Sequence, residues 1–129
     1  MKRYKFLLIS FFIIAFIISA CTKSRKADLE VNNFYDFGKV YVGKDYQHTF
    51  KIKNISQTDL KIIKIGTSCG CTAAIISDSI IKQNEEAEIN VKFKPIVEKL
   101  GLVENSIVFE SNAVNPYTVL KIKADVSVK

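Results

Sequence analysis

Apolar and polar residues alternate with a period of two along most of the chain from Tyr46 onward. In the segment 46–53, Tyr46, His48, Phe50 and Ile52 share one face, and polar residues occupy the positions between them. Successive side chains of a β-strand point to opposite faces, so this pattern predicts a half-buried strand. The same reasoning predicts further strands at residues 34–40, 60–65, 72–76, 87–93, 103–110 and 120–128.

About seven short strands separated by turn residues predict an all-β fold, an immunoglobulin-like β-sandwich. Ile62 and Ile63 interrupt the alternation, which a β-bulge or a wholly buried stretch would explain. Gly38, Gly43 and Gly101 lie where turns are needed, and we expect them to take positive φ.

The first twenty residues have the composition of an export signal rather than of a fold. A basic head contains Lys2, Arg3 and Lys5, and an apolar run over residues 6–18 follows it. This run is shorter than the roughly 20 residues that a membrane-spanning helix needs. We therefore expect a signal peptide at 1–20, a tether at 21–33 and one domain at 34–129.

The junction Ile18-Ser19-Ala20-Cys21 resembles the lipobox of bacterial lipoproteins. That resemblance implies that Cys21 receives a diacylglycerol on its sulfur and becomes the N-terminus, with fatty acids such as palmitate as the anchor. The alternative is a leader cleaved near Ala20 and followed by an ordinary cysteine. Thr22 is not the Asp that retains lipoproteins at the inner membrane in well-studied systems, so we expect the outer membrane, facing the periplasm.

The formal net charge of +6 belongs to the N-terminal segment and not to the domain. The chain has 19 Lys and Arg against 13 Asp and Glu, and all of the excess basic residues precede Asp28. A neutral domain argues against a nucleic-acid-binding surface. The single His and the lack of a Ser-His-Asp order, a phosphate loop or a zinc-protease helix in the sequence argue against an enzyme.

Several motifs together resemble the bacterial family catalogued as domain of unknown function 1573. The resemblance implies an immunoglobulin-like domain and an exported lipoprotein of the Bacteroidetes type, without a settled activity. Where members often have Pro-Gly-Glu, this chain has Asn84-Glu85-Glu86, and an Asn can still take a positive φ. The matching runs are Asp36-Phe37-Gly38-Lys39-Val40, residues 48–54, Thr67-Ser68-Cys69-Gly70-Cys71-Thr72, residues 87–93 and Glu110-Ser111-Asn112.

Cys69 and Cys71, separated by Gly70, are the strongest candidates for chemistry, and three hypotheses remain open. They could be a structural pair, reduced or joined, with Gly70 in an unusual backbone conformation. They could be a strained, easily reduced redox pair, since residues i and i+2 approach disulfide distance only if the chain bends. They could instead bind a soft metal, for which copper(I) is favoured because a closed zinc site needs four ligands.

Two other residues are weaker candidates. His48 lies on the apolar face of its strand, which is typical of a core or rim histidine, but it is also the only imidazole that could join a metal site. Asp78-Ser79-Ile80 resembles a short acceptor motif for O-linked glycans, with Ser79 as the modified residue.

The sequence therefore predicts a lipid-anchored binding or structural module of the cell envelope, without catalytic activity. Its expected partners are the membrane, through the lipid, and another envelope protein or a surface polymer, because a tethered sandwich presents loops and sheet edges. The alternative function is a periplasmic thiol-redox or copper-binding protein that uses Cys69 and Cys71.

Overall fold

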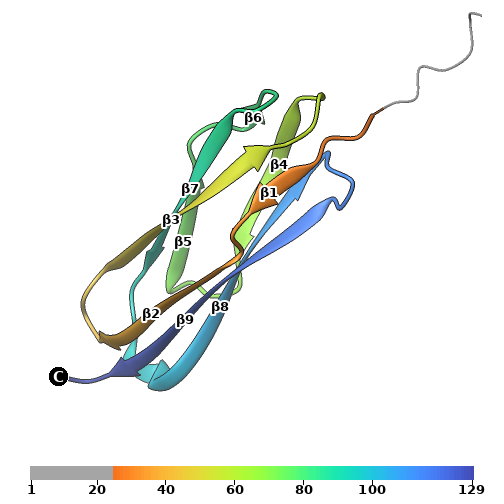
Figure 1. The fold of residues 1–129 in the computed structure, drawn as a ribbon. Coiled ribbons are helices and arrows are strands. Elements are labelled where there is room, and N and C mark those ends of the chain that lie inside the picture. The colour runs from red at the N-terminus through yellow and green to blue at the C-terminus, as the bar shows by residue number, and fades with distance from the viewer. Residues whose placement is uncertain (1–24) are drawn as a thin grey trace, which may run out of the picture.

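A computed structural model describes residues 25–129, which fold into two β-sheets packed face to face (Figure 1). Within these residues one short 3-10 turn, η1 (Val97–Lys99), is the only helical element. No helix in this part of the chain is long and apolar enough to cross a membrane. The strands are β1 (Leu29–Val31), β2 (Phe34–Tyr41), β3 (Tyr46–Asn54), β4 (Leu60–Thr67), β5 (Thr72–Ile76), β6 (Ile80–Ile81), β7 (Glu86–Phe93), β8 (Gly101–Ser111) and β9 (Tyr117–Ser127).

The first sheet has the strand order β1-β3-β7-β5, and the second has the order β2-β9-β8-β4-β6. All neighbours are antiparallel except β2 and β9, which are parallel. The longest ladder joins β8 to β9, from Gly101 opposite Val126 to Glu110 opposite Tyr117. Strands β5 and β6 each pair with one neighbour and therefore form sheet edges.

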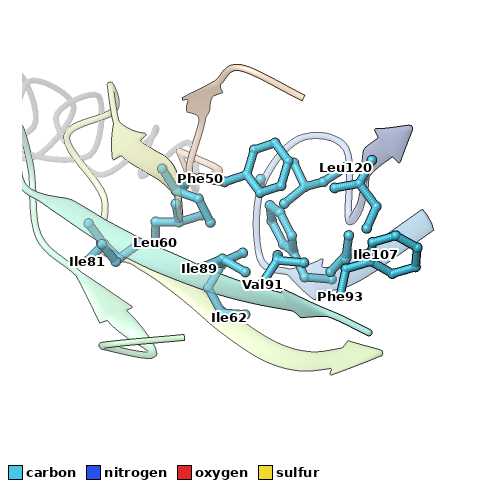
Figure 2. Close-up of a cluster of buried hydrophobic side chains, with 14 of the residues drawn as sticks. Phe50, Leu60, Ile62, Ile81, Ile89, Val91, Phe93, Ile107 and Leu120 are labelled. Atoms are coloured by element: carbon cyan, nitrogen blue, oxygen red, sulfur yellow. The ribbon is translucent and has the colours of Figure 1, made fainter. Parts of the chain in front are cut away.

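The core lies between the sheets and is built from the inward positions of the alternating strands. In β7 every second residue is buried, and β3, β8 and β9 behave in the same way over most of their length. Burial of each large aliphatic or aromatic side chain contributes about 1.5–3 kcal/mol to stability. Figure 2 shows this cluster, whose largest members are Phe50, Phe93, Phe109, Ile52, Leu60, Ile81, Ile89, Ile107, Leu120 and Ile122.

The expected all-β sandwich is confirmed at the level of two β-sheets, and each of the seven expected strands is present. The structure adds two short strands, β1 and β6, that the alternation did not predict. Three and two residues are too few for a period to be visible. At Ile62 and Ile63 the bulge is confirmed, because the register shifts between Ile62 and Lys64 and Ile63 is 64% exposed.

Within the segment 21–33, expected to be a tether, the described residues 25–33 contribute to the sandwich. Ala27 is fully buried and forms a bridge with Ala113, and β1 pairs with β3. Packing thus begins at Ala27 rather than at residue 34. The expected signal peptide at 1–20 and Cys21 lie outside the described residues.

Backbone conformations follow the sequence at most turns. Gly38, Gly43 and Gly101 have φ of 66°, 81° and 85°, as expected. Asn84, which we expected to tolerate a positive φ, has φ of 62°. A short polar side chain tolerates this left-handed conformation, so the turn before β7 is kept.

A buried asparagine joins the loops at one end of the sandwich. The Asn54 amide donates to the carbonyl oxygens of Thr58 and Ile81, both at 2.8 Å. Its side-chain oxygen accepts from the backbone N–H and the hydroxyl of Ser56, at 2.9 and 2.7 Å. Since Asn54 is fully buried, these four bonds compensate for the loss of its hydration.

Candidate functional site

Cys69 and Cys71 form a disulfide in the short loop that leads from β4 to β5. The backbone N–H of Thr72 donates to the carbonyl oxygen of Cys69 at 3.0 Å, which closes a four-residue turn. The turn brings the two Cα atoms to 5.2 Å, within the range that a disulfide requires. Among the sequence hypotheses, the joined pair is therefore the state that this structure has.

Hydrogen bonds on both sides of the turn hold the loop. The Thr67 hydroxyl donates to the carbonyl oxygens of Cys69 and Thr72, at 3.2 and 2.9 Å. The Ser68 N–H donates to the carbonyl oxygen of Ser106 at 2.9 Å, and the Ser106 N–H donates to the Ser68 hydroxyl oxygen at 2.9 Å. The loop is therefore fixed to β8 of the second sheet.

Two donors converge on the sulfur of Cys69. The ammonium of Lys99, at the end of η1, lies 3.3 Å from Sγ, and the backbone N–H of Cys71 lies 3.2 Å from it. An ammonium and an N–H at these distances stabilise negative charge on sulfur. Lys99 is exposed, so water screens part of this effect.

A different group contacts the sulfur of Cys71. The side-chain amide of Asn105 donates to Cys71 Sγ at 3.4 Å and to the Thr72 hydroxyl oxygen at 3.1 Å. Asn105 is 4% exposed and points inward from β8, so its amide connects β8 to the disulfide loop between the two sheets. A neutral amide donates a weaker bond than an ammonium does, so the two sulfurs have different surroundings.

An open hollow of about 240 Å³ lies beside the disulfide, lined by Gly70, Cys71, Ala73, Asp45, Lys92 and Lys94. Gly70 does not have a positive φ, and a Cβ placed on it would meet nothing within 4 Å. The expectation that Gly70 supplies an unusual backbone conformation is thus wrong, because an ordinary turn suffices. Gly70, which has no side chain, lines the hollow beside Cys71.

His48 is not brought to the disulfide. It pairs with Val91 of β7, which pairs with Ala74 of β5, so two strand spacings of about 4.8 Å each separate His48 from the strand that follows the loop. Its ring stacks on Tyr35 with 3.5 Å between centroids and meets Phe50 edge-on. Burial among these rings lowers the pKa of His48 below its usual value of 6.5.

Neither sulfur has a further metal-ligating side chain at hand. No group of three or more His, Cys, Asp or Glu suited to a metal ion occurs among residues 25–129. The side chains that contact the sulfurs are an ammonium, an amide and a hydroxyl, which are not soft ligands. In this structure the two candidate copper(I) ligands are instead joined to each other in the disulfide.

Ser79, the expected glycan acceptor, is exposed in the connection between β5 and β6. The Asp78 carboxylate accepts from the N–H of Ile80 at 2.9 Å, and the Ser79 carbonyl oxygen accepts from the N–H of Ile62. The Ser79 hydroxyl is therefore on an accessible turn. Cys21, the expected lipid acceptor, lies outside the described residues.

Sequence reasoning did not find Lys99 and Asn105, which lie 30 and 34 residues away from the cysteines that they contact. One signal for Asn105 was present: it is in phase with Ile107 and Phe109, so it occupies a buried position of a strand. A buried amide needs a polar partner. Lys99 had no comparable signal, because it is one of many exposed lysines.

A second feature lies on the outer face of the second sheet. We define the apolar strip as Val108, Val119 and Tyr117, of which Val108 and Val119 are directly paired across β8 and β9. Beside it is an open hollow of about 320 Å³ lined by Lys64, Gly66, Val108, Glu110 and Tyr117. Gly66 is opposite Val108 in the neighbouring strand, and its missing side chain deepens this hollow.

The family model described as "Protein of unknown function (DUF1573)" matches residues 29–126. The chain belongs to this family. The match confirms the family that the sequence motifs suggested, and its description assigns no activity. A comparison with curated proteins gave no match.

Solved structures share the sandwich. A protein of unknown function from Porphyromonas gingivalis W83 is 20% identical, has a TM-score of 0.73, and is matched over 82% of this chain and 50% of its own. The chain thus spans about half the length of that protein. The ASH/PapD-like domain 7 of human CEP192 is 10% identical with a TM-score of 0.63, over 87% of this chain and 96% of that one. The Vibrio cholerae VesB protease is 13% identical with a TM-score of 0.57, over 75% of this chain and 31% of its own. At these identities the likeness concerns the fold.

Proposed function

We propose that this DUF1573 protein is a lipid-anchored, immunoglobulin-like binding module of the cell envelope, without catalytic activity. The basic and apolar leader that ends at Cys21 supports the anchor. Position 22 holds Thr rather than the Asp that retains lipoproteins at the inner membrane. This supports a location at the outer membrane, with the domain facing the periplasm. Its partner is another envelope protein or a surface polymer.

The apolar strip is the observation that carries the binding proposal. Val108, Val119 and Tyr117 occupy outward strand positions, where alternation normally places polar residues, and they are 38%, 41% and 63% exposed. Full burial of such a side chain gains about 1.5–3 kcal/mol, which a partner could supply. Lys64 and Glu110 flank the strip with one charge of each sign and can orient a partner.

The orientation of the domain on a membrane favours access to both exposed features. The Thr58 hydroxyl donates to the Arg25 carbonyl oxygen at 2.9 Å, so the chain enters the sandwich beside the start of β4. The eight residues of β4 extend about 25 Å from there to the disulfide loop. In Figure 1 the C-terminus likewise lies at the end of the sandwich opposite the start of the coloured chain. An anchor at Cys21 would hold the disulfide end away from the lipid.

Site-specific photocrosslinking in the native envelope tests the proposal. A photoreactive residue in place of Val119, in the full lipidation-competent chain, is expected to give one discrete crosslinked partner. The matched control is the same residue in place of Lys51, which is exposed on the outer face of the first sheet. When Val108→Asp is added to the protein that carries the photoreactive residue at position 119, the crosslink should be lost.

Two outcomes would count against the proposal. Equal crosslinking from positions 119 and 51 would mean that the apolar strip is not a binding face. An intact mass of the native protein that lacks the lipid on Cys21 would remove the anchor, and the envelope location with it.

A second candidate function is thiol–disulfide exchange at Cys69 and Cys71. The specific observation in its favour is the Lys99 ammonium 3.3 Å from Cys69 Sγ, because a nearby cation favours the thiolate. No contact among residues 25–129 favours the copper alternative in the same way, and the two sulfurs are joined in a disulfide. Reduction of the pair in the folded protein by a dithiol, followed by alkylation and mass measurement, tests this candidate.

A further inference from the structure

We propose that an incoming thiolate attacks the disulfide at Cys71 Sγ, that Cys69 Sγ leaves as a thiolate held by Lys99, and that the site prefers anionic or acidic thiol partners. This inference rests on the second candidate function. It assigns different roles to the two sulfurs and names the chemical class of the partner.

The hollow beside the disulfide favours attack at Cys71, which is one of its lining residues. Cys71 lines this space, together with Gly70 and Ala73, whereas Cys69 does not. Gly70 has no side chain and Ala73 has one methyl group, so these two lining residues fill little of the space beside Cys71. A thiolate attacks a disulfide sulfur along a direction that needs open space, and its rate depends on that access.

The hydrogen bonds identify Cys69 as the leaving sulfur. Its Sγ receives the Lys99 ammonium at 3.3 Å and the Cys71 N–H at 3.2 Å. Cys71 Sγ receives only the neutral amide of Asn105, at 3.4 Å, with the Thr72 hydroxyl at 3.9 Å, among the groups within hydrogen-bond reach in residues 25–129. A better stabilised thiolate leaves faster.

The complete exchange balances with a dithiol as the reductant. The first thiolate forms a bond to Cys71 Sγ, and the electron pair of the Cys69–Cys71 bond passes to Cys69 Sγ. The second thiol of the dithiol then loses its proton and attacks the dithiol's first sulfur, which is bonded to Cys71 Sγ in the mixed disulfide. That bond breaks, and Cys71 is released as a thiolate. The dithiol is oxidised to a disulfide, the protein is reduced by two electrons, and the two protons of the dithiol pass to water or to the new thiolates.

The surroundings carry positive charge that favours an anionic attacker. Lys92 and Lys94 line the hollow, and Lys99 lies at its sulfur. Asp45 forms an ion pair with Lys92 at 3.1 Å and neutralises that lysine in part. Lys94 and Lys99 remain to attract a negatively charged thiol.

The test compares thiols of different charge on the full chain purified in detergent. The probes are mercaptoethanesulfonate, 2-mercaptoethanol and cysteamine, with rates corrected for the thiolate fraction of each. Removing one unit charge near the reacting sulfur changes a rate by about fivefold. Lys99→Met should slow the anionic thiol and speed the cationic one by about fivefold each, so the ratio of the anionic to the cationic rate should fall by about 25-fold. High salt should lower this ratio in the unaltered protein.

Two variants separate charge from structure. Lys99→Arg keeps the cation and should keep the ratio close to that of the unaltered protein. Lys51→Met removes a lysine from an exposed position on β3 and should leave the ratio unchanged. Comparing ratios between proteins cancels the intrinsic differences among the thiols.

Rapid acid quench, alkylation and tandem mass spectrometry locate the mixed disulfide. The expected adduct is on Cys71, with the alkyl group on Cys69. An adduct mainly on Cys69, or equal ratios for Lys99→Met and Lys51→Met, would overturn the inference and leave the second candidate function standing. If no thiol reduces the pair while the protein remains folded, both fail.

Discussion

Replacing both Cys69 and Cys71 with Ser should lower the unfolding free energy only slightly. The size of this loss distinguishes a redox role of the disulfide from a structural one. The disulfide links residues two positions apart, so it closes a loop of three residues. In the chain-entropy description such a loop contributes about 1.6 kcal/mol, against about 4.7 kcal/mol for a loop of 100 residues. The shortness of the loop makes the bond a weak staple.

Packing and hydrogen bonding add modestly to this value. Cys71 is half-buried against the core, and a hydroxyl there is smaller and more polar than a sulfur. Asn105 keeps the Thr72 hydroxyl as its acceptor at 3.1 Å, so its buried amide is not left unpaired. We expect the double variant to lose about 1.5–2.5 kcal/mol of unfolding free energy.

Urea unfolding of residues 25–129, followed by circular dichroism, measures the difference. The unaltered protein, reduced with excess dithiothreitol, provides the matched comparison and should unfold with nearly the same midpoint as the double variant. A loss above about 4 kcal/mol, or a variant with no cooperative transition, would show that the pair is a structural requirement and refute the reasoning.

Two more predictions concern the buried Asn54 and the half-buried His48. Asn54→Ala removes four hydrogen bonds worth about 1 kcal/mol each, so it should lower the unfolding free energy by about 3–4 kcal/mol. The control Asn90→Ala removes one exposed hydrogen bond, from Thr49, and should change the unfolding free energy by less than about 1 kcal/mol. Similar losses for both variants in urea unfolding would contradict this prediction. Burial lowers the pKa of His48 in the folded state below 6.5, so the unfolded state binds more protons and stability should fall as the pH drops below that value. Unfolding between about pH 7 and 5.5 measures this slope, which should diminish in His48→Phe; an unchanged slope would exclude His48 as its source.

The fold was predictable because the core positions repeat every second residue. Phe50 and Ile52 in β3, and Ile89 and Val91 in β7, are buried as the alternation indicated. Burial of one face fixes the strand register, since a shift by one residue would expose every apolar side chain. The period is lost in short strands, so β1 and β6 gave no signal and packing at Ala27 was missed.

The site was only half predictable. Cys69 and Cys71 could be recognised because cysteines two residues apart usually belong to a disulfide, a metal site or a reactive site. Lys99 contacts the cysteines from the turn before β8, and Asn105 contacts them from β8 itself. Such contacts depend on how the sheets stack rather than on local spacing. His48 was grouped with the cysteines only by residue type, and the strand register places it elsewhere.

The apolar strip and the disulfide share a property that favours function over stability as their explanation. Inward strand positions must be apolar for the sandwich to form, but outward positions and loops carry no such requirement. The exposed part of the Val119 side chain, on an outward strand position, contributes no burial free energy to folding. A disulfide that closes a loop of three residues constrains the unfolded chain little. Residues that stability does not require, at two places that solvent and partners can reach, are best explained by what they bind or react with.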